Sequence, residues 1–387
     1  MRRNNLQTVL LSILLIVCLF CACSPGITGV ATESGKAVTA PDGALLSEPS
    51  FVDFPVTRVH YERLSEQGQQ AYRMIYNAVF SHPVKIAVPP VTLEELKVVV
   101  TALKDDNPHL LCLKNQFSYQ QNGGTSYFIP KYTCSAPECE KRTEALLAAA
   151  RDLRASTDAL PDAYEKELFI HDLICESVEY TEADDSTNAY GALVGKKAVC
   201  EGYAYAAKLV CDMARVPCCV LRGTVVSADG AEEGHMWNAA RLGGAWYHLD
   251  LTWDDPVSER ENNVQHAYFN VPTAMVEADH KDFILPEGLT FGTSDAETYY
   301  RREKLVCAED NWRDTVERTL SDVLQNGGGS AEFRFDSLDT LNDAVYDLFD
   351  AGGVYSLEIP AEKIALGDVT YSPDERTLVL RIFISAA

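Results

Sequence analysis

The spacing of apolar residues predicts that the first half of the chain is mainly helical. Apolar residues recur every three or four positions, as in helices with one buried face, over residues 61–78, 93–103, 138–154 and 164–179. Thr92 precedes the second stretch and Glu95 follows three residues later, so we expect a capping box there. A short extended segment, 127–129, follows the turn signal Asn122-Gly123-Gly124. We therefore expect an α-rich region over residues 56–165.

The pattern changes near residue 200. Small and apolar residues form one helical stripe over 200–214, and Pro217 ends it. Strand-type alternation and β-branched residues follow at 219–226, 236–241 and 245–251. The last two segments are joined at Gly243-Gly244, which is typical of a hairpin. A helix followed by antiparallel strands predicts an α+β core, which we place at residues 166–290.

The last part of the chain, residues 291–387, has the pattern of a small α/β unit. Helical spacing occurs at 312–324 and 338–349, and strands are predicted at 332–335 and 377–384. This unit carries no chemical motif. A binding or scaffolding role is therefore its simplest interpretation.

The amino terminus predicts export. A positive start and the apolar run 9–20, too short to span a bilayer, indicate a signal peptide over residues 1–22. Cys23 follows a small residue as in a lipobox, so we expect it to be the lipidated first residue of the mature chain. Because Phe20-Cys21 departs from the usual lipobox, ordinary secretory cleavage is the alternative. Residues 23–55 read as a flexible linker, and we expect a lipid-anchored or secreted protein outside the cytoplasm, in the cell envelope.

Charge excludes one class of partner. The chain has 33 basic and 57 acidic residues, a formal net charge of −24. Nucleic-acid binding requires a basic footprint, so we expect no nucleic-acid partner. Adsorption to anionic lipid is disfavoured for the same reason, so the expected membrane contact is the N-terminal lipid anchor alone. The oligomeric state does not follow from the sequence.

Twelve cysteines are many for an exported chain. Cys134 and Cys139, with four residues between them, suit a local disulfide, whereas Cys112, Cys175 and Cys307 have no obvious partner. The mature chain has no Cys-x-x-Cys pair, so we expect no structural zinc, and nothing indicates a cofactor.

Three motifs carry the candidate chemistry. They are Val199-Cys200-Glu201-Gly202-Tyr203, Gly234-His235-Met236-Trp237-Asn238, and the run from Trp246 to Pro256 that contains Asp250. A cysteine that opens a helix is favoured as thiolate by the helix dipole. The order of cysteine, histidine and acid is that of a thiol nucleophile, its base and the group that orients the base.

These motifs resemble the transglutaminase-like superfamily, most strongly from about Glu167 to Pro256. The resemblance implies a papain-like or transglutaminase-like core in which a helix packs on an antiparallel sheet. It also implies that Cys200 is the nucleophile, His235 the base and Asp250 the orienting acid.

Other residues are expected to support or surround this set. The Cys200 backbone N–H is one expected oxyanion donor, and we assign the second to Tyr190. Trp237 and Trp253 are expected as core and cleft walls. We interpret His248 as a core residue, Asp254 and Asp255 as loop or cap residues, and His171-Asp172 as packing or support.

The implied function is an exported thiol enzyme that acts on peptide or isopeptide amide bonds of a protein or peptide substrate. Hydrolysis through an acyl-enzyme is the favoured outcome. Two alternatives remain open: protein cross-linking by amine transfer, and a non-catalytic envelope scaffold that uses the same fold for binding.

Overall fold

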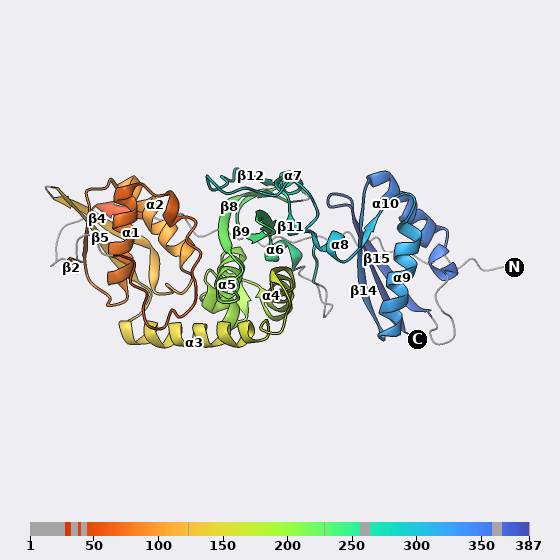
Figure 1. The fold of residues 1–387 in the computed structure, drawn as a ribbon, viewed down its shortest axis with the longest axis horizontal. Coiled ribbons are helices and arrows are strands. Elements are labelled where there is room, and N and C mark those ends of the chain that lie inside the picture. The colour runs from red at the N-terminus through yellow and green to blue at the C-terminus, as the bar shows by residue number, and fades with distance from the viewer. Residues whose placement is uncertain are drawn as a thin grey trace. The chain divides into compact units, whose positions relative to one another are not determined.

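The structure is a computed structural model that describes residues 28–31, 38–39, 45–122, 124–227, 229–255, 264–357 and 366–386. The chain forms two compact units, one ending at Tyr299 and one starting at Tyr300, and each is described by itself (Figure 1). The predicted signal peptide, Cys23 and about half of the predicted linker lie outside the described residues. Those expectations therefore stay predictions.

The first unit begins with two helices packed on a five-stranded sheet of order β1-β4-β5-β3-β2 (Figure 1). The predicted capping box at Thr92 and Glu95 is present at the start of the second helix. The elements are β1 (Thr28–Ala31), β2 (Val38–Thr39), α1 (Glu66–Val79), β3 (Ile86–Val88), α2 (Leu93–Asp106), β4 (Leu113–Asn122) and β5 (Thr125–Tyr132), with a 3-10 turn at Tyr61–Arg63.

This sheet is larger than the sequence pattern indicated. The inner face of β4 is marked by Leu113, Phe117 and Tyr119, and the pairing with β5 shifts register between the first two. The shift interrupts the alternation of apolar and polar positions, and polar residues fill the rest of the strand. The strand signal in the sequence was therefore weak.

The second part of this unit is a helical layer on an antiparallel sheet of order β11-β10-β9-β8-β12. The predicted hairpin is present, and Gly243 and Gly244 have φ of 56° and 95°, as a two-residue turn with both central residues left-handed requires. The elements are α3 (Ala136–Ala155), α4 (Ala163–Ser177), β6 (Glu179–Tyr180), a π turn (Gly191–Gly195), β7 (Lys197–Ala198), α5 (Cys200–Met213), β8 (Cys218–Val226), β9 (Glu232–Leu242), β10 (Ala245–Leu249), α6 (Leu251–Asp254), β11 (Phe269–Val271), α7 (Thr273–Val276) and β12 (His280–Lys281).

Helix α5 is enclosed by protein on every side, because α3 and α4 cover one flank and β8 and β9 the other. The sequence predicted a single apolar stripe, but every residue of α5 is buried. Lys208 and Asp212, one turn apart, form a buried ion pair, and Asp212 also accepts the Thr57 N–H at 3.2 Å. The ion pair and the hydrogen bond thus satisfy the charges of Lys208 and Asp212, which would face water in a helix with only one buried face.

Gly202 allows a preceding loop to pack on the first turn of α5. A Cβ at this position would lie 2.4 Å from the Ser186 carbonyl oxygen and 2.7 Å from Ala198 Cβ. The approach is made by the Ser186 carbonyl of the loop and by Ala198 of β7. The absence of a side chain at Gly202 is therefore a packing requirement of the turn that begins with Cys200.

The disulfide joins Cys112 to Cys139, so the predicted local pairing of Cys134 with Cys139 is wrong. Cys112 directly precedes β4, and Cys139 lies in the first turn of α3. The hydrogen bond from Thr133 N–H to the Cys112 carbonyl, 3.0 Å long, brings the end of the β5 segment back to the start of β4. The following turn then places Cys139 with its Cα 5.7 Å from that of Cys112.

The second unit is a helix-and-sheet module whose sheet has the order β13-β14-β16-β15. The predicted helices and two strands are present, whereas the long strand β15 was not anticipated. In its interior Arg381 Nε donates to Glu332 Oε1 at 3.0 Å. The elements are α8 (Tyr299–Arg302), which spans the division between the units, β13 (Val306–Cys307), α9 (Trp312–Gln325), β14 (Gly328–Phe335), α10 (Leu338–Val345), a π turn (Tyr346–Asp350), a 3-10 turn (Gly353–Ser356), β15 (Leu366–Asp374) and β16 (Val379–Ala386).

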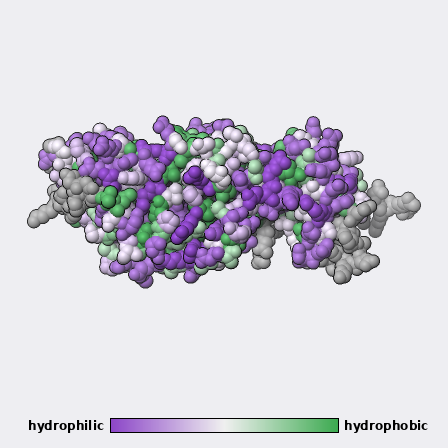
Figure 2. All heavy atoms as spheres, viewed as in Figure 1, coloured by the Kyte–Doolittle hydropathy of each residue, from purple (hydrophilic) through white to green (hydrophobic). Residues whose placement is uncertain are grey.

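Hydrophilic side chains cover much of the face drawn in Figure 2, with smaller hydrophobic groups between them. Within the described ranges, every helix is too short or too polar to cross a lipid bilayer.

We expect Gly202→Ala to lower the free energy of unfolding by about 1–3 kcal/mol, the usual cost of forcing a methyl group into packed structure. Urea unfolding followed by circular dichroism measures this change. The matched control is Gly195→Ala, because a Cβ there would have its nearest neighbour, the Tyr190 carbonyl oxygen, at 3.9 Å. Equal stability of the two variants would contradict the packing argument.

Candidate active site

Asp250 is the centre of the candidate site. It leaves β10 and caps the one-turn helix α6, and its Oδ1 accepts the N–H groups of Thr252 at 3.0 Å and Trp253 at 3.3 Å. Its Oδ2 accepts Nε2–H of His235 from the neighbouring strand β9 at 2.7 Å. The structure thus brings together the predicted base and the predicted orienting acid.

A second histidine, which the sequence analysis missed, binds the same carboxylate. His280 on β12 donates from Nε2 to Asp250 Oδ2 at 3.0 Å and from Nδ1 to Asp279 at 2.6 Å. Asp279 also accepts the Tyr268 hydroxyl at 2.6 Å. β12 has two residues and no motif, so only its pairing with β8 reveals that His280 reaches the site.

The charges in this network favour an ionised carboxylate. Burial alone would raise the pKa of Asp250, but the His235 and His280 rings outweigh it and hold that pKa well below the usual range. Burial would lower the pKa of His280, but its hydrogen bonds to Asp250 and Asp279 raise it. With a carboxylate on each ring nitrogen, His280 is held as an imidazolium.

Two tryptophans lie next to His235. Trp237 stacks beside it with ring centroids 5.8 Å apart, and Trp253 lies at 6.2 Å. Trp237 is fully buried and donates its indole N–H to His248 Nδ1 at 3.1 Å, so it forms an inner wall. Burial lowers the pKa of His248 to about 3, and this neutral ring is the core residue that the sequence indicated. Trp253 is half-buried.

Cys200 is the first residue of α5 and is not part of a disulfide. Two contacts join the first turns of α5 to β9, the strand that carries His235, and to its neighbour β8. Arg222, next to the β8 partner of His235, reaches Glu201 at 3.4 Å. Farther along β9, Asn238 donates its side-chain amide to the Ala204 carbonyl at 3.0 Å. The helix start and the histidine strand are therefore held in the same region.

All three predicted residues are buried: Cys200 is 1%, His235 6% and Asp250 1% exposed. Electrostatic interactions are stronger in such a setting than at a wetted surface. The hydrogen bond to Asp250 engages Nε2 of His235.

Tyr190, the predicted second oxyanion donor, lies in the loop before the π turn. Its backbone N–H donates to Asn188 Oδ1 at 2.9 Å, and the Arg142 guanidinium lies 4.6 Å from its ring centroid. Its amide is thus engaged within its own loop. An oxyanion role for Tyr190 stays a prediction.

A second carboxylate–histidine cluster lies at the other end of α6. His171 donates to Asp172 at 2.9 Å and is 3.3 Å from Asp254, while His266 is 3.0 Å from Asp172. Burial raises the pKa of Asp254 to about 6 despite the neighbouring His171. Asp254 is therefore more than the loop or cap residue that we expected. The packing or support role of His171-Asp172 stays a prediction.

Two groups in this region have ligand atoms close enough for a metal ion, all within 4.8 Å of one another: His235, Asp250 and His280, and His171, Asp172 and His266. In both groups hydrogen bonds already join these atoms, and a metal ion would have to replace them. The arrangement therefore favours holding and moving protons over binding a metal ion.

We expect His280→Gln to destabilise the fold more at low pH than at high pH. Because its folded pKa is raised above the ordinary 6.5, its stabilising contribution is complete below that value and is lost as the pH rises through the folded pKa. Urea unfolding at about pH 5.5 and about pH 9 should show a loss of about 1.5–3 kcal/mol at the lower pH and a smaller loss at the higher.

The control is His109→Gln. Burial lowers the pKa of His109 to about 3, so in the wild type this residue opposes folding as the pH falls below 6.5. The cost of its replacement should therefore be smaller at the lower pH, the opposite trend. The same trend in both variants would contradict the charge assignment of His280.

Comparison with known proteins finds a family model that matches part of the chain. Residues 148–251 match the sequence model of the transglutaminase-like superfamily, and this range contains Cys200, His235 and Asp250. No curated protein matches the chain.

The solved structures that are similar to the chain include two candidate proteases and a TGase. A candidate cysteine protease from Cytophaga hutchinsonii is 16% identical, with 33% of this chain and 52% of that chain covered and a TM-score of 0.23. A TGase structure is 13% identical, with coverages of 45% and 53% and a TM-score of 0.25. A candidate protease from Parabacteroides distasonis is 11% identical, with coverages of 78% and 65% and a TM-score of 0.24.

The chain thus spans about half to two thirds of the length of these structures. At such TM-scores no residue role is taken from them. The helix on an antiparallel sheet is the α+β core predicted from the sequence, and residues 148–251 of this chain form a domain of the transglutaminase-like superfamily.

Proposed function

We propose that this protein is a thiol enzyme that acts on peptide or isopeptide amide bonds, with Cys200 as nucleophile, His235 as base and Asp250 as orienting acid. The 2.7 Å hydrogen bond from His235 Nε2 to Asp250 carries the proposal. It leaves Nδ1 as the ring nitrogen for proton exchange with the thiol. The start of α5 favours the thiolate through the unpaired N–H groups of the first turn.

The proposed reaction has two halves. The Cys200 thiolate attacks the amide carbonyl carbon, and the Cys200 backbone N–H donates to the oxyanion that forms. The His235 imidazolium then protonates the departing amine, the C–N bond breaks, and an acyl-enzyme remains. In the second half His235 takes a proton from water, the hydroxide attacks the thioester, and the carboxylic acid leaves as Cys200 regains its thiolate.

Asp250 acts on His235 in both halves. Its carboxylate fixes the ring orientation and stabilises the imidazolium each time it forms. His280, fixed from the opposite side, keeps the carboxylate in place. We assign His280 a positioning role.

Hydrolysis is the proposed outcome, and cross-linking is the alternative. Both begin with the same acyl-enzyme, and they differ in whether water or an amine resolves it. The substrate is proposed to be a protein or peptide.

The thiol chemistry predicts that Cys200 is alkylated by iodoacetamide well below the ordinary thiol pKa of about 8.5. In His235→Ala the pH midpoint should rise towards that value, because the imidazolium that stabilises the thiolate is gone. Peptide mass spectrometry measures each cysteine separately. Cys175 and Cys307 are internal controls, because burial raises their pKa values to about 11 and about 12.

The same protein, incubated with a peptide library and a primary amine, shows which product forms. New peptide termini or deamidated glutamine indicate hydrolysis, and amine adducts indicate transfer. Each should be lost in Cys200→Ala and fall about 10²–10⁴-fold in His235→Ala. An ordinary Cys200 titration in both proteins, with no product above the Cys200→Ala background, would favour the scaffold interpretation.

Export and lipidation through Cys23 are part of the proposal and are supported by the N-terminal sequence. In a bacterial host we expect a labelled fatty acid to be incorporated into the wild-type chain and not into Cys23→Ser. Cys18→Ser is the matched control, since that residue lies within the predicted signal peptide. Equal labelling of wild type and Cys23→Ser would contradict the anchor assignment.

A further inference from the structure

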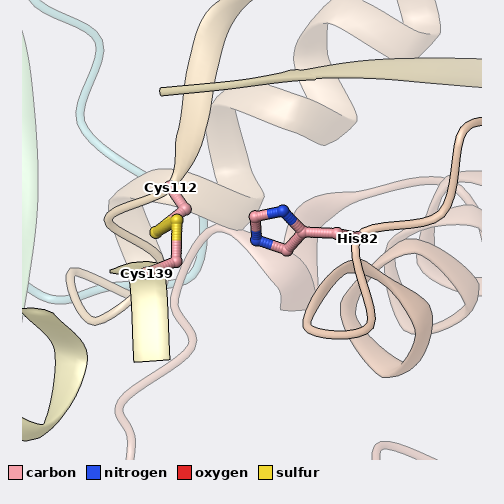
Figure 3. A group of neighbouring side chains, drawn as sticks. All are labelled: His82, Cys112 and Cys139. Atoms are coloured by element: carbon pink, nitrogen blue, oxygen red, sulfur yellow. A yellow bond between two sulfur atoms is a disulfide. The ribbon is translucent and has the colours of Figure 1, made fainter. Parts of the chain in front are cut away.

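Three sulfur atoms and an imidazole gather at one corner of the sheet in the first unit. Cys112 lies before β4, Cys134 follows β5, and Cys139 lies in the first turn of α3. His82 comes from the loop after α1, and Figure 3 shows its ring directed towards the Cys112–Cys139 disulfide. Nothing in the chemistry proposed for Cys200 uses this group.

Three of these residues have ligand atoms that lie close together, and the fourth, Cys134, lies next to one of them. One ligand atom from each of His82, Cys112 and Cys139 lies within 4.8 Å of the others. The Cys134 sulfur lies 3.6 Å from that of Cys112. In a tetrahedral zinc site with Zn–S bonds of about 2.3 Å, neighbouring sulfurs are about 3.8 Å apart. The separation of the Cys134 and Cys112 sulfurs is thus close to that of two sulfur ligands of one zinc ion.

The surrounding structure holds the imidazole in place. The ring of His82 stacks on Tyr132 with centroids 3.9 Å apart. The Tyr132 hydroxyl donates to the Pro83 carbonyl at 3.1 Å, which fixes the loop that carries the histidine. His82 itself has φ of 52°, a backbone conformation that non-glycine residues rarely adopt and that tertiary contacts must maintain.

The position of one of the cysteines also favours a thiolate. Cys139 lies in the first turn of the long helix α3, where unpaired N–H groups and the helix dipole favour a thiolate. Cys134 is half-buried and is not in a disulfide. The backbone hydrogen bond from Thr133 N–H to the Cys112 carbonyl holds the chain segments of Cys112 and Cys134 together and does not depend on the disulfide.

We propose that reduction of the Cys112–Cys139 disulfide creates a binding site for a thiophilic divalent cation such as Zn²⁺, with Cys112, Cys134, Cys139 and His82 as ligands. A dithiol reductant supplies two electrons and two protons, so that the disulfide becomes two thiols and the dithiol becomes a disulfide. The cation then displaces three thiol protons and binds three thiolates and the neutral imidazole. Three cysteines and one histidine form a ligand set that zinc commonly takes in structural sites.

This site has no sequence signature because its ligands come from separate segments. The usual signal is a pair of cysteines two to four residues apart followed by another pair. Here Cys134 and Cys139 are local, whereas Cys112 and His82 arrive through the β4–β5 hairpin and the loop after α1. The expectation of no structural zinc rested on local spacing alone.

The test uses the full mature chain and Co²⁺ as a spectroscopic probe. Protein reduced with a dithiol and then freed of it without oxygen should bind one Co²⁺ at this site, with thiolate-to-cobalt charge transfer and the visible bands of a tetrahedral site. Zn²⁺ should displace the signal. Oxidised protein should not give it. In Cys134→Ser and in His82→Ala the affinity should fall at least about tenfold, the smaller end of what loss of even an outer-shell partner costs.

Two control variants locate the signal. Cys307→Ala removes a buried thiol of the second unit and Cys200→Ala removes the proposed nucleophile, and both should bind Co²⁺ as the wild type does. Cys134→Ser and His82→Ala leave the disulfide intact, so circular dichroism of their oxidised forms shows whether they fold. If reduced wild type and folded Cys134→Ser bind Co²⁺ equally, or if the signal is lost in Cys200→Ala alone, the proposal is wrong.

Discussion

An ionised carboxylate buried at the end of β10 has to be satisfied by donors from three separate elements. Asp250 receives two backbone N–H groups of α6, the His235 ring from β9 and the His280 ring from β12. Leaving such a charge without one partner typically costs about 3–5 kcal/mol. The requirement therefore fixes how α6 starts and how far the outer strand β12 reaches along the sheet.

The same short helix joins a second buried carboxylate to the first. Asp250 precedes α6 and Asp254 ends it, and each accepts hydrogen bonds from a histidine on another element or lies next to one. A separation of four residues corresponds to one helical turn. The motif from Trp246 to Asp254 thus consists of strand β10, which leads to Asp250, and the single helical turn α6, which has a buried carboxylate at each end.

Much of this arrangement could be predicted from local signals. The stripe over 200–214, the β-branched segments and Gly243-Gly244 predicted α5, β8, β9 and β10, because each signal depends on neighbours in sequence. His280 could not be predicted, because it reaches Asp250 through one strand pairing. The burial of Lys208 and Asp212 was also hidden, since a helical stripe cannot show that both flanks of a helix will be covered. The disulfide was mispredicted because it also depends on tertiary structure. The β4–β5 hairpin, not the spacing of cysteines, brings Cys112 to Cys139.

Burial of the candidate site sets how a substrate could reach it. Cys200, His235 and Asp250 are each less than a tenth exposed, and Trp237 closes the inner side, whereas Trp253 is half-buried beside His235. Under the proposed function a substrate would have to reach these covered residues, and Trp253 is the more exposed of the two indole rings beside His235. Indole rings beside His235 lower the local polarity, which would strengthen the attraction within the thiolate–imidazolium pair that we propose. If the proposed acyl-enzyme forms there, the same burial would favour a small acyl acceptor such as water over a bulky amine.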